Sequence, residues 1–202
     1  MRVFCRIRPI PDGASVHNRN VGRDHFWVSK LECEAILADA DGKAPGDKMA
    51  FPANVAARLV RFHLIDNVRS IPDLWTEQEV KRCEFAARFE GSGEAGVRRF
   101  SFHGDFAQET ADRTRGQDGH IDGEFSIDVK TAKIIRFRAY AKATGWGSST
   151  YAKQGAIDGN FPLVYAIVDV DDSASRIVPP YGVSELMDYE RPALVLPKST
   201  GK

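Results

Sequence analysis

Residues 97–107 read VRRFSFHGDFA and residues 119–129 read GHIDGEFSIDV. In both stretches the apolar residues alternate with polar ones, which is the period of two that a β-strand requires. Stretches 80–90, VKRCEFAARFE, and 133–143, KIIRFRAYAKA, repeat the pattern, with Ile135 assigned to the apolar set of the last one. Four consecutive strands joined by short links predict an antiparallel sheet with one apolar face.

That apolar face needs a cover, and residues 52–63 are the best amphipathic helix in the sequence. Val55, Leu59 and Phe62 recur there at helical spacing, after a proline suited to a first turn. We therefore predict an α+β fold, in which one helix packs on a curved antiparallel β-sheet of cystatin-like form. The alternative is a sheet that closes to a lipocalin-like barrel around the same apolar residues.

The remaining segments divide the chain into three parts. Residues 1–24 form an N-terminal strand, with alternating Val3, Cys5 and Ile7, and a loop. Residues 25–170 form a single β-rich domain, in which 25–37 and 161–170 are further strands. Residues 171–202 are rich in proline and lack periodicity, which predicts an irregular C-terminal tail.

Composition excludes several classes of protein. The 202 residues carry 28 basic and 28 acidic side chains, so no nucleic-acid partner is expected, because that partner requires a positive field. No apolar run approaches the roughly 20 residues of a membrane span, and the chain as given shows no signal peptide. The compartment stays open. The three cysteines have no CxxC spacing and are interpreted as buried thiols.

The polar faces of the strands contain the one constellation suited to chemistry. The polar residues of stretch 97–107 and those of stretch 119–129 can lie on the same face of the sheet only in certain registers, because side chains alternate between the two faces. A register centred on the loop 107–118 pairs His103 with Asp122 and Asp105 with His120. The next hairpin sets Glu124 opposite Arg138, Asp122 opposite Tyr140 and His120 opposite Lys142, and the preceding turn brings Glu84 beside His103 and Arg82 beside Asp105.

This His/carboxylate patch has three interpretations. His103, His120 and Asp122 could ligate a divalent metal as cofactor, since imidazole and carboxylate suit such ions. Without a metal, general acid–base catalysis would use the following residues: His103, Asp105, His120, Asp122 and Glu124. The third interpretation is a solvated sheet face with cross-strand charge pairs and no further role. Enclosure of the face would favour the first two, and exposure the third.

Ligand-binding candidates lie both on this face and outside it. They are His63, Arg69, Arg138, Tyr140 and Trp146, the last in a glycine-flanked loop that could close over a ligand. For His63 the favoured interpretation is a buried histidine at a helix end, because no spacing places a second ligand beside it.

Two stretches resemble an uncharacterised family of bacterial domains. They are RFHLIDNVR at 61–69 and RFRAYAKATGWGSSTY at 136–151, followed by FPL. In that family an Arg-Phe-His-Leu-x-Asp-Asn-x-Arg segment precedes strands that end in Arg-Phe and Trp-Gly. The resemblance covers residues 51–165 and implies a β-rich fold, but no activity. It singles out the following positions: Arg61, Phe62, His63, Asp66, Asn67, Arg69, Trp146 and Gly147. The His/carboxylate pairs are not part of its pattern.

Three functions follow as hypotheses, and whether the chain is an enzyme stays open. The first is a domain that binds a small, hydrophobic molecule, because the sheet offers more aromatic surface than one short helix covers. That surface consists of Phe85, Phe89, Phe100, Phe102, Phe125 and Phe137. The second is a metal-assisted or acid–base enzyme that uses the His/carboxylate patch. The third is a structural module that forms a homodimer through the polar face or a strand edge.

Overall fold

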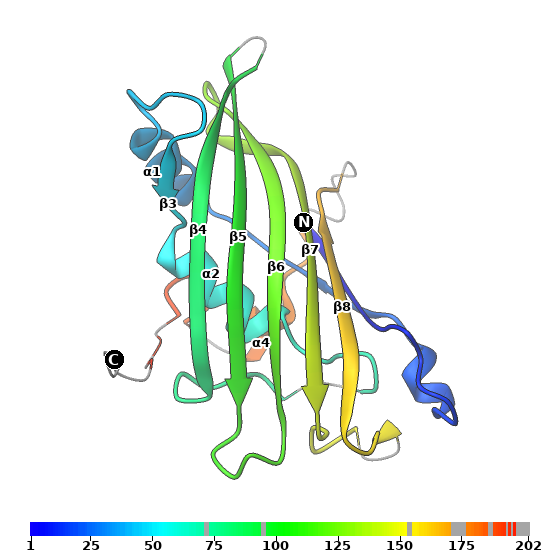
Figure 1. Ribbon diagram of the computed structural model, residues 1–202. Helices are drawn as coiled ribbons and strands as arrows, with labels where there is room; N and C mark the ends of the chain where they lie inside the picture. Colours follow the sequence, from blue (N-terminus) through cyan, green and yellow to red (C-terminus); the bar gives the residue numbers. More distant parts are fainter. Residues whose placement is uncertain are drawn as a thin grey trace.

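The computed structural model describes residues 1–70, 73–93, 96–152, 155–170, 177–185, 188–192, 194 and 196 (Figure 1). The strands are β1 Arg2–Ile7, β2 Gly22–His25, β3 Lys48–Ala50, β4 Val80–Ser92, β5 Val97–Glu109, β6 Gly116–Asp128, β7 Lys133–Trp146 and β8 Asn160–Val168. The helices are α1 Lys30–Asp39, α2 Ala53–Arg58, α4 Tyr181–Glu185, the 3₁₀-helix η1 Val16–Arg19 and the π-helix η2 Leu59–His63.

All eight strands belong to one antiparallel sheet of order β2-β1-β8-β7-β6-β5-β4-β3. The helices α1, α2 and α4 lie on one side of this curved sheet (Figure 1), which confirms the α+β prediction. β2 and β3 form its two edges and do not pair with each other. The barrel alternative is therefore wrong. Edge strands of only four and three residues offer few hydrogen bonds for closure.

The phenylalanines of the inner face fill the core instead of leaving a hollow above the sheet. The rings of Phe100 and Phe125 stack with centroids 4.9 Å apart, and Phe51 comes within 4.8 Å of Phe102. Phe137 is 2% exposed. The predicted ligand site over these aromatic residues is thus occupied by side chains, and any site for a small molecule must lie elsewhere.

The helix predicted at 52–63 is confirmed as α2 continued by η2. Every residue from Val55 to Ile65 is buried, although an amphipathic helix on a sheet normally keeps one exposed face. The reason is a second layer: the segment 26–29, the start of α1 and residues 188–190 lie over the side turned away from the sheet. Hydrogen bonds from Arg58 to Trp27, Glu32 and Tyr189 hold this layer in place.

The strand predicted at 25–37 is wrong. β2 ends at His25, and α1 begins after Ser29 with a capping box: Ser29 Oγ accepts the Glu32 N–H, and the Glu32 carboxylate accepts the Ser29 N–H. This reciprocal cap satisfies the backbone N–H groups of Ser29 and Glu32, which in a strand would need a partner on a neighbouring strand. It outweighs the weak strand preference of the aromatic residues in 25–28.

Both terminal parts pack on the central domain. β1 lies between β2 and β8, with Cys5 opposite Tyr165. In the tail, α4 and the buried Tyr189 contact the helical layer, while residues 171–176, 186–187 and most of 193–202 lie outside the described residues. Among the helices that the structure describes, none is long and apolar enough to cross a membrane.

Candidate functional site

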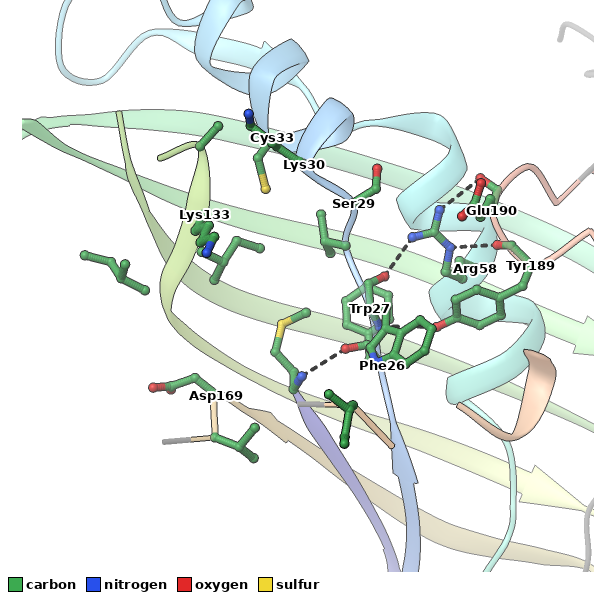
Figure 2. Close-up of a pocket in the computed structure, with 17 residues that line it drawn as sticks. Phe26, Trp27, Ser29, Lys30, Cys33, Arg58, Lys133, Asp169, Tyr189 and Glu190 are labelled. Atoms are coloured by element: carbon green, nitrogen blue, oxygen red, sulfur yellow. Dashed lines mark hydrogen bonds between the residues drawn. The ribbon is translucent and has the colours of Figure 1, made fainter. Parts of the chain in front are cut away.

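An open groove of about 630 Å³ lies where α1 and the segment before it pass over the start of β7 (Figure 2). Most of its surface is apolar, and its apolar lining residues include the buried Phe26 together with Trp27, Val28, Ile134, Ile135 and Ile177. Polar groups stand around it on Ser29, Lys30, Lys133, Asp169 and Glu190. Apolar walls with a few polar groups are typical of small-molecule sites.

A β-bulge at the start of β7 shapes one wall of the groove. Ser126 pairs with Arg136 and Ile127 with Ile134, so Ile135 is an extra residue between the two pairs. The bulge reverses strand parity, so Ile134 packs on the core while Ile135 is 50% exposed. The prediction that Ile135 lies on the inner face is wrong for this reason, and the displaced side chain lines the groove.

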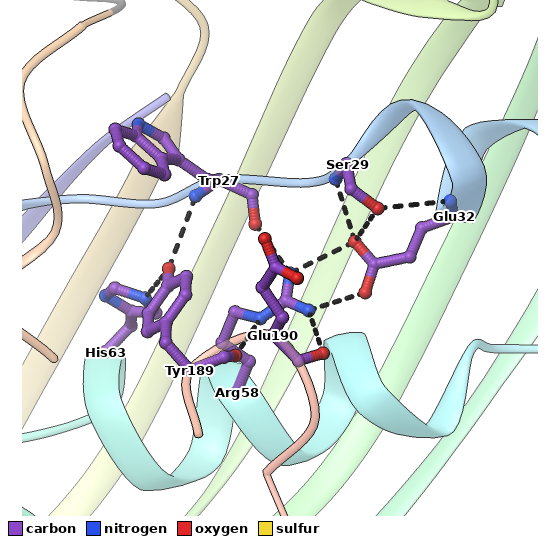
Figure 3. Close-up of polar contacts among 7 residues, drawn as sticks. All are labelled: Trp27, Ser29, Glu32, Arg58, His63, Tyr189 and Glu190. Atoms are coloured by element: carbon purple, nitrogen blue, oxygen red, sulfur yellow. Dashed lines mark hydrogen bonds and ion pairs between the residues drawn. The ribbon is translucent and has the colours of Figure 1, made fainter. Parts of the chain in front are cut away.

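Arg58 ties the opposite wall together (Figure 3). Its Nε donates to the Tyr189 carbonyl at 2.8 Å, and Nη1 donates to the Trp27 carbonyl at 2.7 Å and to Glu32 Oε2 at 3.1 Å. Nη2 donates to Glu32 Oε1 and, at 3.0 Å, to the Glu190 carbonyl. All five guanidinium donors are therefore used. Arg58 joins α2 to α1, to the 26–29 segment and to residues 189–190.

The partner carboxylate has two structural tasks. Glu32 caps α1 through Ser29 and pairs with Arg58, whose side chain is 2% exposed. Burial raises the pKa of Glu32, but hydrogen bonds from Arg58 and Ser29 outweigh it and hold that pKa below its ordinary value. Glu32 is thus ionised near neutral pH, and its charge is satisfied within the protein by Arg58 and Ser29.

Behind the groove, His63 links β2 to the C-terminal segment. Its Nδ1 lies 3.0 Å from Asp24 Oδ2, and its Nε2 lies 2.7 Å from Tyr189 Oη (Figure 3 shows the contact with Tyr189). Burial lowers the pKa of His63, although the hydrogen bond to Asp24 raises it, and the net pKa is below the ordinary value. The ring is therefore neutral near pH 7: Nδ1–H donates to Asp24, and Nε2 accepts from the Tyr189 hydroxyl.

These contacts hold Tyr189 in place, and they engage both its hydroxyl and the His63 ring in structural hydrogen bonds. Burial raises the pKa of Tyr189, so its hydroxyl stays protonated and donates. The same oxygen accepts the Trp27 N–H at 3.3 Å, and the ring stacks on Phe62 with centroids 5.6 Å apart. His63, at 1% exposure, does not line the groove itself but contacts two residues that do, Tyr189 and Phe26. The favoured interpretation of a buried histidine agrees with this burial.

The stretch RFHLIDNVR fastens the helix end to distant parts of the sheet. Arg69 pairs with Asp66, donates to the Gly147 carbonyl at 2.9 Å and lies 4.5 Å over the Phe161 ring. Gly147 has φ +69°, and a Cβ there would come 1.8 Å from the Thr114 carbonyl oxygen. The two stretches that carry the family resemblance are thus joined by a hydrogen bond, and the positions that it brings together support the fold.

The His/carboxylate patch lies on the outer face of the sheet in the predicted registers. β5 and β6 pair His103 with Asp122 and Asp105 with His120. β6 and β7 pair Glu124 with Arg138, Asp122 with Tyr140 and His120 with Lys142. These registers are confirmed.

The register predicted between β4 and β5 is wrong by two residues. Glu84 lies opposite Asp105, and Arg82 lies opposite Ala107, where it pairs with Asp118 at 2.6 Å. Ser92 pairs with Arg98, so the hairpin is centred further along the chain than the prediction placed it, and an irregularity between Phe89 and Gly91 shifts the ladder by one residue. Alternation alone reveals neither the centre of the turn nor the bulge.

His120 is occupied by carboxylates on both sides. Nδ1 lies 2.7 Å from Asp105 Oδ1, and Nε2 lies 3.2 Å from Asp122 Oδ1. The hydrogen bond to Asp105 raises the pKa of His120, with a further rise from Asp122, which favours the protonated ring that donates from both nitrogens. A metal ligand or general base needs a free nitrogen lone pair.

The surroundings of the patch do not enclose it. The side chains of His120, Asp105 and Asp122 are 47%, 53% and 73% exposed. Within the part of the chain that the structure describes, no three His, Cys, Asp or Glu side chains are grouped to hold a metal ion. The metal and acid–base interpretations of the patch therefore stay predictions, and the exposure favours a solvated face.

The five predicted ligand-binding residues all lie away from the groove lining. Tyr140, 47% exposed, and Arg138 are on the outer face, and Lys142 Nζ lies 5.5 Å from the Tyr140 ring centroid. Arg69 and Trp146 border a void of about 20 Å³ under the end of β7. His63 lies behind Tyr189.

The residues that shape the groove were missed. Arg58, Glu32, Asp24 and Tyr189 belong to segments interpreted as helix, strand, loop and tail, respectively. The Ser29-x-x-Glu32 spacing of a capping box was the available signal for the start of α1. No local pattern signals that an arginine within a helix is buried.

Comparison of the chain with protein-family models, curated proteins and solved structures finds no match in any of the three. The groove and its chemistry therefore carry the functional argument.

Proposed function

We propose that the chain binds a small, largely apolar molecule in the groove between α1 and β7. The observation that carries this proposal is an open hollow of about 630 Å³ with a mainly apolar lining. Pockets for small ligands measure roughly 300–1,000 Å³ and have linings of this kind.

Exposed apolar side chains at the groove support the proposal. Ile135 is 50% exposed and Ile177 is 78% exposed, and both line it. Apolar surface gathered in one place is favourable to cover, at roughly 25 cal/mol per Å² removed from water. A bound apolar molecule would cover both side chains together.

The walls are suited to hold a fixed shape. Arg58 uses all its donors on Glu32 of α1 and on the segments that carry Trp27, Tyr189 and Glu190. Tyr189 is held from behind by His63. A pocket formed before the ligand arrives loses less conformational entropy on binding. No catalytic step is part of this proposal, and the Arg58 guanidinium, the His63 ring and the Tyr189 hydroxyl are engaged in structural bonds.

An uncharged fluorophore tests the proposal. N-phenyl-1-naphthylamine should gain fluorescence on titration with the protein and should quench Trp27, which lines the groove. Ile135→Glu places a charge in the groove and should raise the Kd at least about tenfold, because burying an unpaired carboxylate is costly. Val16→Glu is the matched control, at a side chain 71% exposed and outside the groove.

Two outcomes would contradict the proposal. One is the absence of saturable binding of the fluorophore to the wild-type protein. The other is equal affinity of the Ile135→Glu and Val16→Glu variants, which would place the binding site elsewhere. An enzymatic role of the outer patch and a homodimer remain hypotheses that no observation favours over the groove.

A further inference from the structure

The groove has a cationic end where α1 meets β7. Lys30 lies in the first turn of α1, one helical turn before Cys33, and the Cys33 thiol contacts the backbone of Ile134. Lys133 is the first residue of β7 and precedes Ile134. Both lysines line the groove (Figure 2), so two ammonium groups approach it from two different elements.

These two charges are available to a ligand. Among the described residues, the Lys133 amine has no hydrogen-bond or ion-pair partner, and its side chain is exposed. Lys30 pairs with Glu34 at 3.4 Å, with side chains 67% and 46% exposed. Such an exposed pair within one helix is weak and is easily exchanged for another anion.

The other charged groups of the groove do not oppose an anion at this end. Arg58 is neutralised by Glu32. Asp169 binds the backbone N–H of Phe137 at 3.3 Å, four residues along β7 from Lys133, which corresponds to roughly 13 Å of strand. Glu190 stands at the Arg58 wall, where its carbonyl accepts from that side chain.

We propose that the ligand is a single-chain anionic amphiphile, with its carboxylate or phosphate between Lys30 and Lys133 and its tail on the apolar lining. The tail would cover Ile134 and Ile135 and run towards Phe26. This inference rests on the proposed function and adds the class of ligand. Exposed ion pairs are individually weak, so two of them should favour an anionic over a neutral head group by roughly three- to tenfold.

Four ligands of one chain length test the inference: dodecanoate, dodecyl phosphate, dodecanol and dodecyltrimethylammonium. Each is titrated below its micelle concentration against the protein loaded with the uncharged fluorophore, and the Kd follows from displacement. Both anions should bind roughly three- to tenfold more tightly than dodecanol, and the cation more weakly than dodecanol. The tighter of the two anions identifies the head group.

Charge reversal locates the head group. Lys133→Glu should abolish the preference for anions over dodecanol and leave the Kd of dodecanol within about twofold. Lys81→Glu is the matched control, because Lys81 is exposed on β4, bonds only the Gln78 carbonyl among the described residues and lies outside the groove. It should keep the wild-type preference.

The outcomes distinguish a failure of this inference from a failure of the proposed function. Equal affinity for dodecanol and the two anions in the wild-type protein, or equal shifts in the Lys133→Glu and Lys81→Glu variants, would overturn the inference while the groove remains a binding site. Displacement by none of the four ligands would overturn the inference, and loss of fluorophore binding itself would overturn the proposed function.

Discussion

Replacing Arg58 with methionine should destabilise the protein more than any exposed substitution, because this side chain holds the second layer on α2. The change keeps most of the aliphatic volume and removes all five donors. The carbonyls of Trp27, Tyr189 and Glu190 then lose a partner, and the Glu32 carboxylate, 14% exposed, loses its counter-ion.

The expected magnitude follows from these contacts. Removing one partner of a buried ion pair costs about 3–5 kcal/mol, because the other charge stays buried and unpaired. The three carbonyls would each add about 0.5–1.5 kcal/mol if they remained dry, but water admitted at the groove would satisfy part of them. We expect a loss of about 3–5 kcal/mol, a large part of the roughly 5–15 kcal/mol that stabilises a typical domain.

Urea unfolding followed by tryptophan fluorescence measures this loss through the midpoint and the slope. Arg136→Met is the matched control, at an exposed arginine of β7, and should change the unfolding free energy by less than about 0.5 kcal/mol. If Arg58→Met fails to fold, Glu32→Gln keeps a partner for the guanidinium and should lose about 1–2 kcal/mol. A loss below 1 kcal/mol for Arg58→Met would refute the structural role assigned to Arg58.

Burial lowers the pKa of His63 below its ordinary 6.5. As the pH falls, this histidine is therefore protonated in the unfolded chain before it is protonated in the folded chain. The stability difference between wild type and His63→Gln should therefore fall as pH drops below 6.5, by up to about 1.4 kcal/mol per pH unit, measured as urea midpoints from pH 5 to 8. His120→Gln should show the opposite sign, because the Asp105 hydrogen bond raises the pKa of His120: its contribution is present below pH 6.5 and is lost as pH rises through the raised pKa. Parallel pH profiles would contradict this assignment. Gly147→Ala should lower the melting temperature much more than Gly42→Ala; both glycines have positive φ, but only a Cβ at Gly147 meets backbone, 1.8 Å away. Equal losses would show that the close approach to Thr114 is relieved cheaply.

The sheet and its outer registers could be predicted, because they depend on local rules. Alternation fixes which face each side chain takes, and the links after β5 and β6 fix how neighbouring strands meet. His103 was therefore placed opposite Asp122, and Glu124 opposite Arg138, as the structure has them. The same rules failed at the β4–β5 hairpin, where a misplaced turn centre put Arg82 opposite the wrong residue, and at the bulge of β7, which turned Ile135 outward.

The candidate site could not be predicted, because its residues meet only in the folded chain. His63 is separated by 39 residues from Asp24 and by 126 from Tyr189. The same side chain on an exposed helix face would titrate as an ordinary histidine. Its role, like that of Arg58, is set by burial under segments that carry no periodic signal.

The sequence by itself determined the long strands β4 to β8, the covering helix and the pairing of the outer face from β5 to β7, since these depend on the period of two and on the lengths of the links. The tertiary structure alone decided which polar groups were removed from water and where apolar surface was left uncovered. Burial is a property of what lies on top of a residue, and here the covering residues come from both ends of the chain.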